Sequence, residues 1–443
     1  MTSTSPASPP PTAERGPTRR LSDLLKRPVV DSGGETLGRL SDVIVRLSGS
    51  DYPQVTGIVV ALGGGREVFV PLDQVVGFDG EVIKLTTAKL DLRQFERRDG
   101  EVLLNADVLG HRLIDVPNAR LVRAADLQLT QDNGEWVLSG VDTRRRARRL
   151  FGLLGPSRSA DEPGDGPGFR DWHDFEWLIG HVGSNLQRGP FARVRRLKPA
   201  QIADLLEEAS KNEETEILDR VHADPELEAD VFEELDEDLA TRLLGARTDH
   251  EIAAVLSRMR ADDAADAVAE LPQRRRQPVL DLLPPSQRTK VLTLLGFNQT
   301  SAGGLMGVDY VAVPSNSKVS DALAEVRAAT TLQPEALTSV HAVDIDGALS
   351  GVARLVALVQ SDPDRSLLDV SETDPVRVGA DTDVMDVAVL MTDYNLITIP
   401  VVDDERRMLG VITVDDVLEV TLPDDWRRRE AAEPPDARHG DAR

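Results

Sequence analysis

An internal repeat constrains this chain more than any other feature of its sequence. Residues 309–322 align without a gap with residues 374–387, which lie 65 positions further on. Each copy then adds a helical segment and two apolar, β-branched runs that are separated by a polar turn, over 340–355 in the first copy and 399–414 in the second. Such paired runs predict a β-hairpin. We therefore expect two tandem β-α-β-β-α units, an α+β pair.

A second, weaker repeat lies earlier in the chain. Over residues 27–85, short β-type runs alternate with glycine-rich turns, a pattern that is typical of a small β-barrel. Asp31 and Asp42 lie 11 residues apart, and Asp115 and Asp126 repeat that spacing. We therefore expect two related all-β units that form one pseudo-symmetric module.

Helical periodicity dominates residues 197–295. Segments of about 10–12 residues are separated by prolines and acidic turns, and several of them contain a pair of leucines. Helices this short bury their apolar faces only by stacking on one another, so the pattern predicts an all-α superhelix. Before it, Trp172, Phe175 and Trp177 follow helical spacing and predict a packing helix.

Together these patterns predict a multidomain chain. The expected order is a disordered tail at 1–18, an all-β barrel unit at 27–90, a second, degenerate unit at 100–150, a linker at 151–171, an all-α superhelical domain at 172–300, α+β units at 308–370 and 371–421, and a disordered tail at 426–443. The tails and the linker contain too little apolar surface to offset the entropy lost on ordering.

Composition excludes several classes of protein. The 443 residues include no cysteine, which excludes disulfides and thiolate metal sites and favours a cytoplasmic location. No run approaches the roughly 20 apolar residues of a membrane-spanning helix. A net charge of −25 argues against nucleic acid as a partner and favours cations or basic surfaces. The seven histidines follow no catalytic or metal-ligand spacing, so we expect no enzyme activity.

Two motifs in the first β unit resemble the PRC-barrel family. They are Asp31–Val43 (DSGGETLGRLSDV) and Val68–Leu72 (VFVPL). The family's fold is a small β-barrel that serves as a docking module. The resemblance implies that this region binds another protein, such as a membrane transporter.

The second α+β unit resembles a CBS domain. Its residues 410–416 (GVITVDD) match the closing strand-to-helix signature of that family. The resemblance implies that Thr413 would contact the phosphate and Asp416 the ribose of an adenine nucleotide such as ATP, and the start of a helix suits a phosphate. The first copy has Arg354 and Ala357 at the matching places. The alternative is that Thr413 only caps the helix. Because CBS pairs associate through their helices, the resemblance also implies a homodimer.

The order of the helical domain and the CBS pair resembles the cytosolic part of the MgtE family of magnesium transporters. The resemblance covers residues 197–421 and includes Ser301–Met306 (SAGGLM). In that family the superhelix and the CBS pair sense Mg²⁺ and control a membrane pore. The family's pore helices do not follow in this sequence, so we expect no transport by this polypeptide alone.

Acidic residues in this region predict a Mg²⁺ site. Asp262 and Asp266 lie one helical turn apart, where like charges repel by roughly 0.2–0.5 kcal/mol in isolation and a cation reverses the effect. By the resemblance, this pair corresponds to the sensor carboxylates of the family and would bind Mg²⁺ together with Asp416 and Asp383 of the second CBS unit. Mg²⁺ prefers one or two carboxylates and several retained waters. The alternative is a solvated acidic helix face.

Three functions remain open. The first is a soluble cytoplasmic regulatory protein in which Mg²⁺, with an adenine nucleotide as a further ligand, closes the domains and signals to a partner on the barrel. The second is a scaffold without ligand sensing. It is favoured by Arg354 and Ala357, which replace the hydroxyl and the acid of the CBS signature, and by Met385 and Asn395, which stand where the MgtE pattern often has acids. The third is a soluble subunit of a split magnesium transporter.

Overall fold

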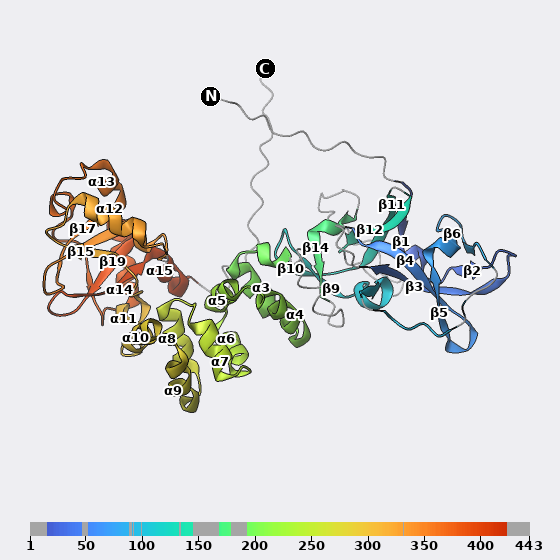
Figure 1. Ribbon diagram of the computed structural model, residues 1–443, viewed down its shortest axis with the longest axis horizontal. Coiled ribbons are helices and arrows are strands. Elements are labelled where there is room, and N and C mark those ends of the chain that lie inside the picture. Colours follow the sequence, from blue (N-terminus) through green and yellow to red (C-terminus); the bar gives the residue numbers. More distant parts are fainter. Residues whose placement is uncertain are drawn as a thin grey trace, which may run out of the picture. The chain divides into compact units, whose positions relative to one another are not determined.

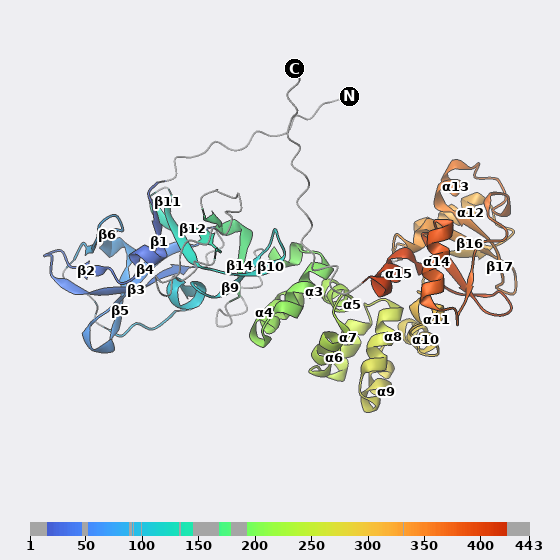
Figure 2. The same ribbon diagram turned by 180° about the vertical axis from the view of Figure 1, so that it is seen from behind.

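The computed structural model divides into two compact units, residues 1–236 and 237–443 (Figures 1 and 2). It describes residues 16–46, 52–87, 91, 93–98, 100–132, 134–144, 168–178, 193–330 and 332–422. The two predicted tails and the predicted linker lie almost wholly outside these residues. Two ends of those ranges are corrected, because Thr18 begins strand β1 and residues 170–171 form strand β13.

An 11-stranded sheet dominates the first unit. Its strands are β1 (Thr18–Arg20), β2 (Pro28–Val30), β3 (Thr36–Arg46), β4 (Gln54–Ala61), β5 (Glu67–Pro71), β6 (Val75–Gly77), β7 (Ile83–Leu85), β8 (Glu101–Leu103), β11 (Asp126–Asp132), β12 (Glu135–Asp142) and β13 (Arg170–Asp171). Neighbours follow the order β1-β11-β12-β4-β3-β2-β7-β6, with β13 beside β12, β5 beside β4 and β8 beside β3. This sheet therefore contains strands of both predicted β units, and the two units share one apolar core.

The two halves of this sheet exchange their first elements. Strand β1 pairs with β11, and β8 pairs with β3, so each half contributes a strand to the other. Each strand leads into a helical turn, α1 (Leu21–Leu24) or η3 (Leu104–Val108). Asp126 accepts hydrogen bonds from Ser22 N (3.1 Å) and Ser22 Oγ (2.6 Å), and Asp42 accepts from Asn105 N (2.7 Å) and Ala106 N (2.9 Å). Asp42 and Asp126, which repeat in the sequence, thus each bind the helical turn that the other half of the sheet contributes.

The predicted packing helix around Trp172 is wrong. Residues Trp172–Asp174 form a short 3-10 turn, and Phe175–Trp177 form strand β14, which pairs with β9 (Arg112–Asp115) beside β10 (Arg120–Arg123). The rings of Trp172 and Phe175 are buried in the β-rich core, and the edge of β9 supplies hydrogen bonds to the backbone. Tertiary contacts therefore override an aromatic spacing that also fits a helix. The predicted all-α range of 172–300 is corrected accordingly, since its first residues belong to the β-rich region.

Short helices follow, as the periodicity predicts. The first unit contains α3 (Pro199–Glu208), α4 (Lys211–Val221) and α5 (Pro225–Glu233), and the second contains α6 (Glu237–Gly245), α7 (Asp249–Leu256), α8 (Ala261–Glu270), α9 (Gln273–Leu282), α10 (Pro285–Leu294) and α11 (Ala302–Leu305). Local signals start several of them: Thr248, for example, caps α7 by exchanging hydrogen bonds with Glu251. No helix in the described ranges combines the length and the apolar character needed to cross a membrane.

The tandem β-α-β-β-α prediction is confirmed. The first copy consists of β15 (Ala312–Pro314), α12 (Val319–Ala328), β16 (Ser339–Val343), β17 (Leu349–Arg354) and α13 (Leu355–Gln360); the second consists of β18 (Val378–Gly379), α14 (Val384–Tyr394), β19 (Thr398–Val402), β20 (Met408–Thr413) and α15 (Val414–Thr421). Register is conserved between the copies: Ser339 lies opposite Arg354, and Thr398 lies opposite Thr413. Each copy forms its own three-stranded sheet.

Candidate functional site

Helix α8 carries Asp262 and Asp266, the first two predicted metal ligands. Its apolar face, which includes Ala264 and Val268, is buried, so the carboxylates lie at the margin of the packed face. Burial raises the pKa of Asp262 to about 6. The guanidinium of Arg260 opposes this shift, whereas the negative charges of Asp416 and Asp266 add to it. Asp262 therefore lies in an environment that disfavours its charge unless a cation is near.

Helix α15 begins at Thr413 and carries Asp416 in its first turn. Asp416 Oδ2 accepts hydrogen bonds from Thr413 N (3.0 Å) and Thr413 Oγ1 (2.6 Å), which closes a capping box. Both side chains are buried. The structure thus shows Thr413 and Asp416, the predicted nucleotide ligands, in a helix cap.

Arg260 joins α8 to α15. Its Nη1 donates to Asp416 Oδ1 (2.9 Å), its Nε donates to Asp263 Oδ2 (2.6 Å), and its Nη2 lies 3.9 Å from Glu419 Oε2. The Arg260 side chain is only 23% exposed. The guanidinium therefore provides the positive charge between two acidic helix starts.

Sequence reasoning missed Arg260. The only local signal is its place immediately before the acidic first turn of α8, at the N-cap position. Its partner Asp416 is 156 residues away, so spacing along the chain contains no trace of the ion pair.

Asp266 and Asp383 point to other neighbours. Asp266 Oδ1 accepts a hydrogen bond from Gln299 Nε2 (2.8 Å). The surrounding protein raises the pKa of Asp266, the bond from Gln299 opposes the shift, and nearby glutamates add to it. Asp383 caps α14 by accepting from Met385 N (2.8 Å), and its backbone bridges to Ser301. The structure thus brings Asp262 close to Asp416, while the contacts of Asp383 lie with α14 and Ser301.

The donor set can be tested against Mg²⁺. Within the described ranges, no three His, Asp or Glu side chains are grouped so as to hold a metal ion. Asp262 and Asp416 nevertheless supply two oxygen ligands of the kind that Mg²⁺ uses with retained waters. Because Arg260 already neutralises Asp416, Mg²⁺ would compete with a guanidinium at this place.

A cavity with space for a larger ligand is lined by residues of both copies of the pair. This cavity of about 550 Å³ is lined by Arg354 and Ala357 at the junction of β17 and α13, and by Thr338, Asn395 and Thr398. Neither Thr413 nor Asp416 lines it. The predicted phosphate and ribose ligands therefore lie outside this cavity, which the β17–α13 junction of the first copy borders.

Three domain families match this chain. Residues 197–300 match the MgtE intracellular N domain, residues 367–422 match the CBS domain, and residues 17–92 match the PRC-barrel domain. The chain thus contains a β-rich PRC-barrel region, a helical MgtE N domain and a CBS pair, and the resemblances inferred from its motifs are confirmed.

Curated relatives match part of the chain, and solved structures are similar over about half of it. The magnesium transporter MgtE of Thermus thermophilus is 38% identical over 164 residues, which cover 36% of each chain, and that of Bacillus subtilis is 23% identical over 229 residues, which cover 52% of this chain and 50% of that protein. This chain therefore spans about half the length of these relatives, or less. The cytosolic domain of the Mg²⁺ channel MgtE in complex with ATP is 31% identical, with a TM-score of 0.49 over 53% of this chain and 97% of that one. The soluble part of a magnesium transporter is 24% identical, with a TM-score of 0.48 over 53% and 92%.

Proposed function

We propose that this protein is a non-catalytic, Mg²⁺-responsive regulator that acts in the cytoplasm in magnesium homeostasis or in the control of magnesium transport. One observation carries the proposal: the part-buried carboxylate of Asp262 lies near Asp416 of the second CBS unit, with Arg260 as the cation that keeps the two charges compatible. The relatives named magnesium transporter MgtE support the choice of ion.

The response arises from differential affinity. When bound, Mg²⁺ would supply two positive charges and accept oxygen ligands from Asp262 and Asp416. The raised pKa of Asp262 means that a deprotonated carboxylate is costly at this place, and a cation removes that cost. A ligand changes the balance of two conformations only when it binds one of them better. Contact between α8 and α15 provides such a conformation, because separation of the helices removes one of the two carboxylates.

A nucleotide such as ATP is the second proposed ligand. The cavity beside Arg354 has room for it, and Arg354 supplies a guanidinium that can hold a phosphate. We place the nucleotide at this cavity rather than at Thr413, because neither Thr413 nor Asp416 lines it.

The proposed partners are a second copy of this chain and a further protein. The outer faces of α13, α14 and α15 expose apolar side chains, among them Val356, Val359, Met385, Val389 and Leu418. Burial of such a face against its equivalent would stabilise a homodimer through the CBS pair. The PRC-barrel region would hold the further partner, such as a membrane transporter.

Scaffolding without sensing is the second candidate function. It is favoured by the ion pair of Arg260, which satisfies Asp416 without any metal, and by the finding that the described residues contain no group of three potential metal ligands. A soluble subunit of a split magnesium transporter is a variant of the first proposal in which the partner is a pore.

Mg²⁺ titration of the full chain tests the first proposal. Hydrogen–deuterium exchange is followed in α8 and α15 as Mg²⁺ rises from micromolar to tens of millimolar at constant ionic strength. We expect protection of both helices in the millimolar range, and its loss in the double variant Asp262→Ala/Asp266→Ala. The control is Asp238→Ala, which removes an exposed acid from α6. If the wild type and the double variant respond alike, Mg²⁺ sensing at this site is rejected and scaffolding takes its place.

A further inference from the structure

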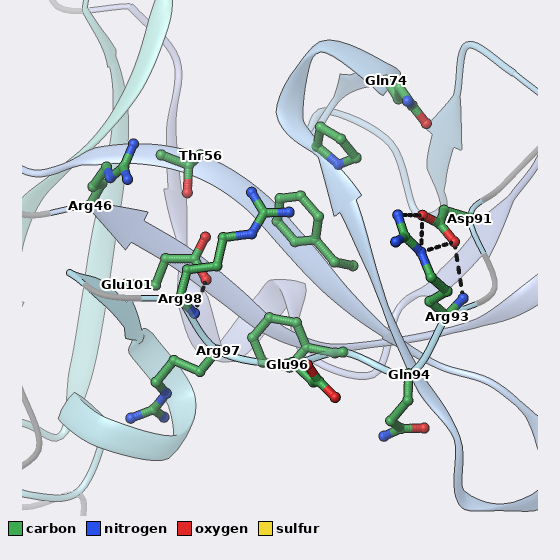
Figure 3. A pocket seen from close by; sticks show the side chains of 13 residues that line it. Arg46, Thr56, Gln74, Asp91, Arg93, Gln94, Glu96, Arg97, Arg98 and Glu101 are labelled. Carbon is green, nitrogen blue, oxygen red and sulfur yellow. Dashed lines mark hydrogen bonds and ion pairs between the residues drawn. The ribbon is translucent and has the colours of Figure 1, made fainter.

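A second large cavity opens on the β-rich region, far in sequence from the CBS pair. It measures about 930 Å³ and lies over strands β3, β4 and β5 (Figure 3). Its lining consists of Arg46, Thr56, Phe69, Pro71, Gln74, Asp91, Arg93, Gln94, Phe95, Glu96, Arg97, Arg98 and Glu101. We call this cavity the arginine groove.

A segment that is hydrogen-bonded at two points lines the groove. Residues 93–98 are fixed near their middle, where Phe95 N donates to Glu67 O of β5 (2.8 Å), and at their end, where Arg98 N donates to Glu101 Oε2 (3.0 Å). The rings of Phe69 and Phe95 stack with centroids 6.4 Å apart. Gly57 of β4 lies against the Phe69 ring, and a Cβ atom there would collide with it. The groove thus has an apolar, aromatic surface built into the sheet.

Guanidinium groups surround this surface. Arg93 Nε donates to Asp91 Oδ2 (2.8 Å), and Arg97 Nη2 lies 3.0 Å from Asp107 Oδ1. Arg46 and Arg98 form no ion pair with any carboxylate in the part of the chain that the structure describes. The Arg98 guanidinium lies 5.2 Å from the centroid of the Phe69 ring. Two arginines are therefore available to a ligand, in a chain whose net charge is −25.

We propose that the arginine groove binds an acidic peptide segment of a partner protein, in which carboxylates alternate with aromatic or aliphatic side chains. Arg46 and Arg98 would receive the carboxylates, and the rings of Phe69 and Phe95 would pack against the apolar side chains. Interfaces are enriched in arginine and aromatic residues, the types that the groove presents together.

Acidic residues in the lining favour a peptide over a nucleic acid. Asp91, Glu96 and Glu101 lie in the same groove as the arginines. A continuous row of phosphates would meet these carboxylates as well as the guanidiniums, and nucleic-acid affinity depends on neutralising phosphates with an uninterrupted basic surface. A peptide can place single carboxylates at Arg46 and Arg98 and keep them away from Glu96.

The inference rests on the proposed docking role of the PRC-barrel region, and it adds the surface and the chemistry of the partner. It does not depend on Mg²⁺ sensing.

Fluorescence anisotropy with the full chain tests it. The probe is a labelled peptide in which glutamate and phenylalanine alternate; the comparison probes are its lysine counterpart and a single-stranded RNA. We expect the acidic peptide to bind, and the double variant Arg46→Glu/Arg98→Glu to weaken that binding by at least about tenfold. Arg39→Glu is the matched control, because it reverses another exposed charge on β3 and should leave binding unchanged.

Other outcomes overturn the inference. Equal binding of the lysine peptide, preference for RNA, or no binding of the acidic peptide by the wild type each rejects an acidic peptide as the ligand. Equal binding of a membrane protein to the β-rich region in the wild type and in Arg46→Glu/Arg98→Glu rejects the groove as the binding surface. That result leaves the docking role of the PRC-barrel region standing. The Mg²⁺ titration decides the sensing proposal separately.

Discussion

The two copies of the CBS pair differ at the junction between their last strand and their last helix. In the first copy, Arg354 ends β17 and lines a cavity of about 550 Å³. In the second, Thr413 ends β20 and donates to Asp416, whose other oxygen is held by Arg260. One junction therefore faces open space, and the other is tied to the helical domain.

The shared topology of the two copies therefore does not determine which junction can bind a ligand. The register is the same in both copies, since Arg354 and Thr413 lie opposite Ser339 and Thr398. A carboxylate in the first turn of α15 attracts a guanidinium, whereas α13 has Ala357 in the equivalent place and attracts none. The four predictions below are ordered from the largest expected effect to the smallest.

Asp416→Ala should have the largest effect on the difference between the two junctions. The substitution removes both the acceptor of the α15 cap and the partner of Arg260, so we expect the stability of α15 against opening to fall by about 2–3 kcal/mol. Hydrogen–deuterium exchange of α15 measures the change. Asp415→Ala, an exposed neighbour in the same turn, should have little effect. If the two substitutions cost the same, the cap and the ion pair do not stabilise the junction.

A change of pH should act on the contact between α8 and α15 through Asp262. Because the pKa of Asp262 is raised to about 6 in the folded protein, the folded state binds more protons than the unfolded state between about pH 4 and pH 6. The free energy of unfolding should therefore fall as pH rises through this window, by about 2 kcal/mol. Thermal unfolding of the wild type and of Asp262→Asn measures it.

Asp42 complicates that experiment and supplies its control. Burial also raises the pKa of Asp42 to about 6, so the β-rich region contributes a similar slope. The difference between the wild type and Asp262→Asn isolates Asp262, and the slope due to Asp42 should persist in the variant. Identical pH profiles for the two proteins would contradict the assignment.

Arg260→Gln should strengthen Mg²⁺ binding at the second copy's junction, because it removes the competing cation. We expect the midpoint of Mg²⁺ protection to fall by about tenfold, which corresponds to about 1.4 kcal/mol, because Mg²⁺ no longer displaces a guanidinium. The Mg²⁺ titration described above measures it, with Arg258→Gln, on the preceding turn, as the control. A midpoint that stays constant or rises would show that Arg260 does not compete with the metal.

Arg354→Ala should affect only ligand binding in the cavity that Arg354 lines. We expect ATP binding, followed with a fluorescent ATP analogue, to weaken by roughly threefold to tenfold, since one charge-assisted contact to phosphate is lost at a solvent-open site. Arg327→Ala removes an exposed arginine from α12 and serves as the control. Binding that depends on Thr413 and not on Arg354 would place the nucleotide at the second copy.

The sequence predicted the architecture where local patterns carry it. The repeat at 65-residue spacing predicted two β-α-β-β-α units. The 11-residue spacing of Asp31 and Asp42, which Asp115 and Asp126 repeat, predicted that the β-rich region is built from related halves. The alternation of apolar residues in strands and their period in helices are local properties, so they can be read from the sequence before the fold is known. The exchange of β1 and β8 between the halves cannot be predicted from a local pattern, because each of these strands pairs with a strand more than 50 residues away in the sequence.

The candidate site shows the same division. From the sequence alone, Asp262 and Asp266 are placed one turn apart on a helix, Asp416 is placed at the start of another, and the MgtE, CBS and PRC-barrel domains are recognised by their motifs. Only the tertiary structure decided that Arg260 pairs with Asp416, that Asp383 caps α14, and that the open cavity borders the β17–α13 junction of the first copy. Helix period and caps are set by neighbours within about four residues, whereas an ion pair depends on which distant surfaces the packed core brings together.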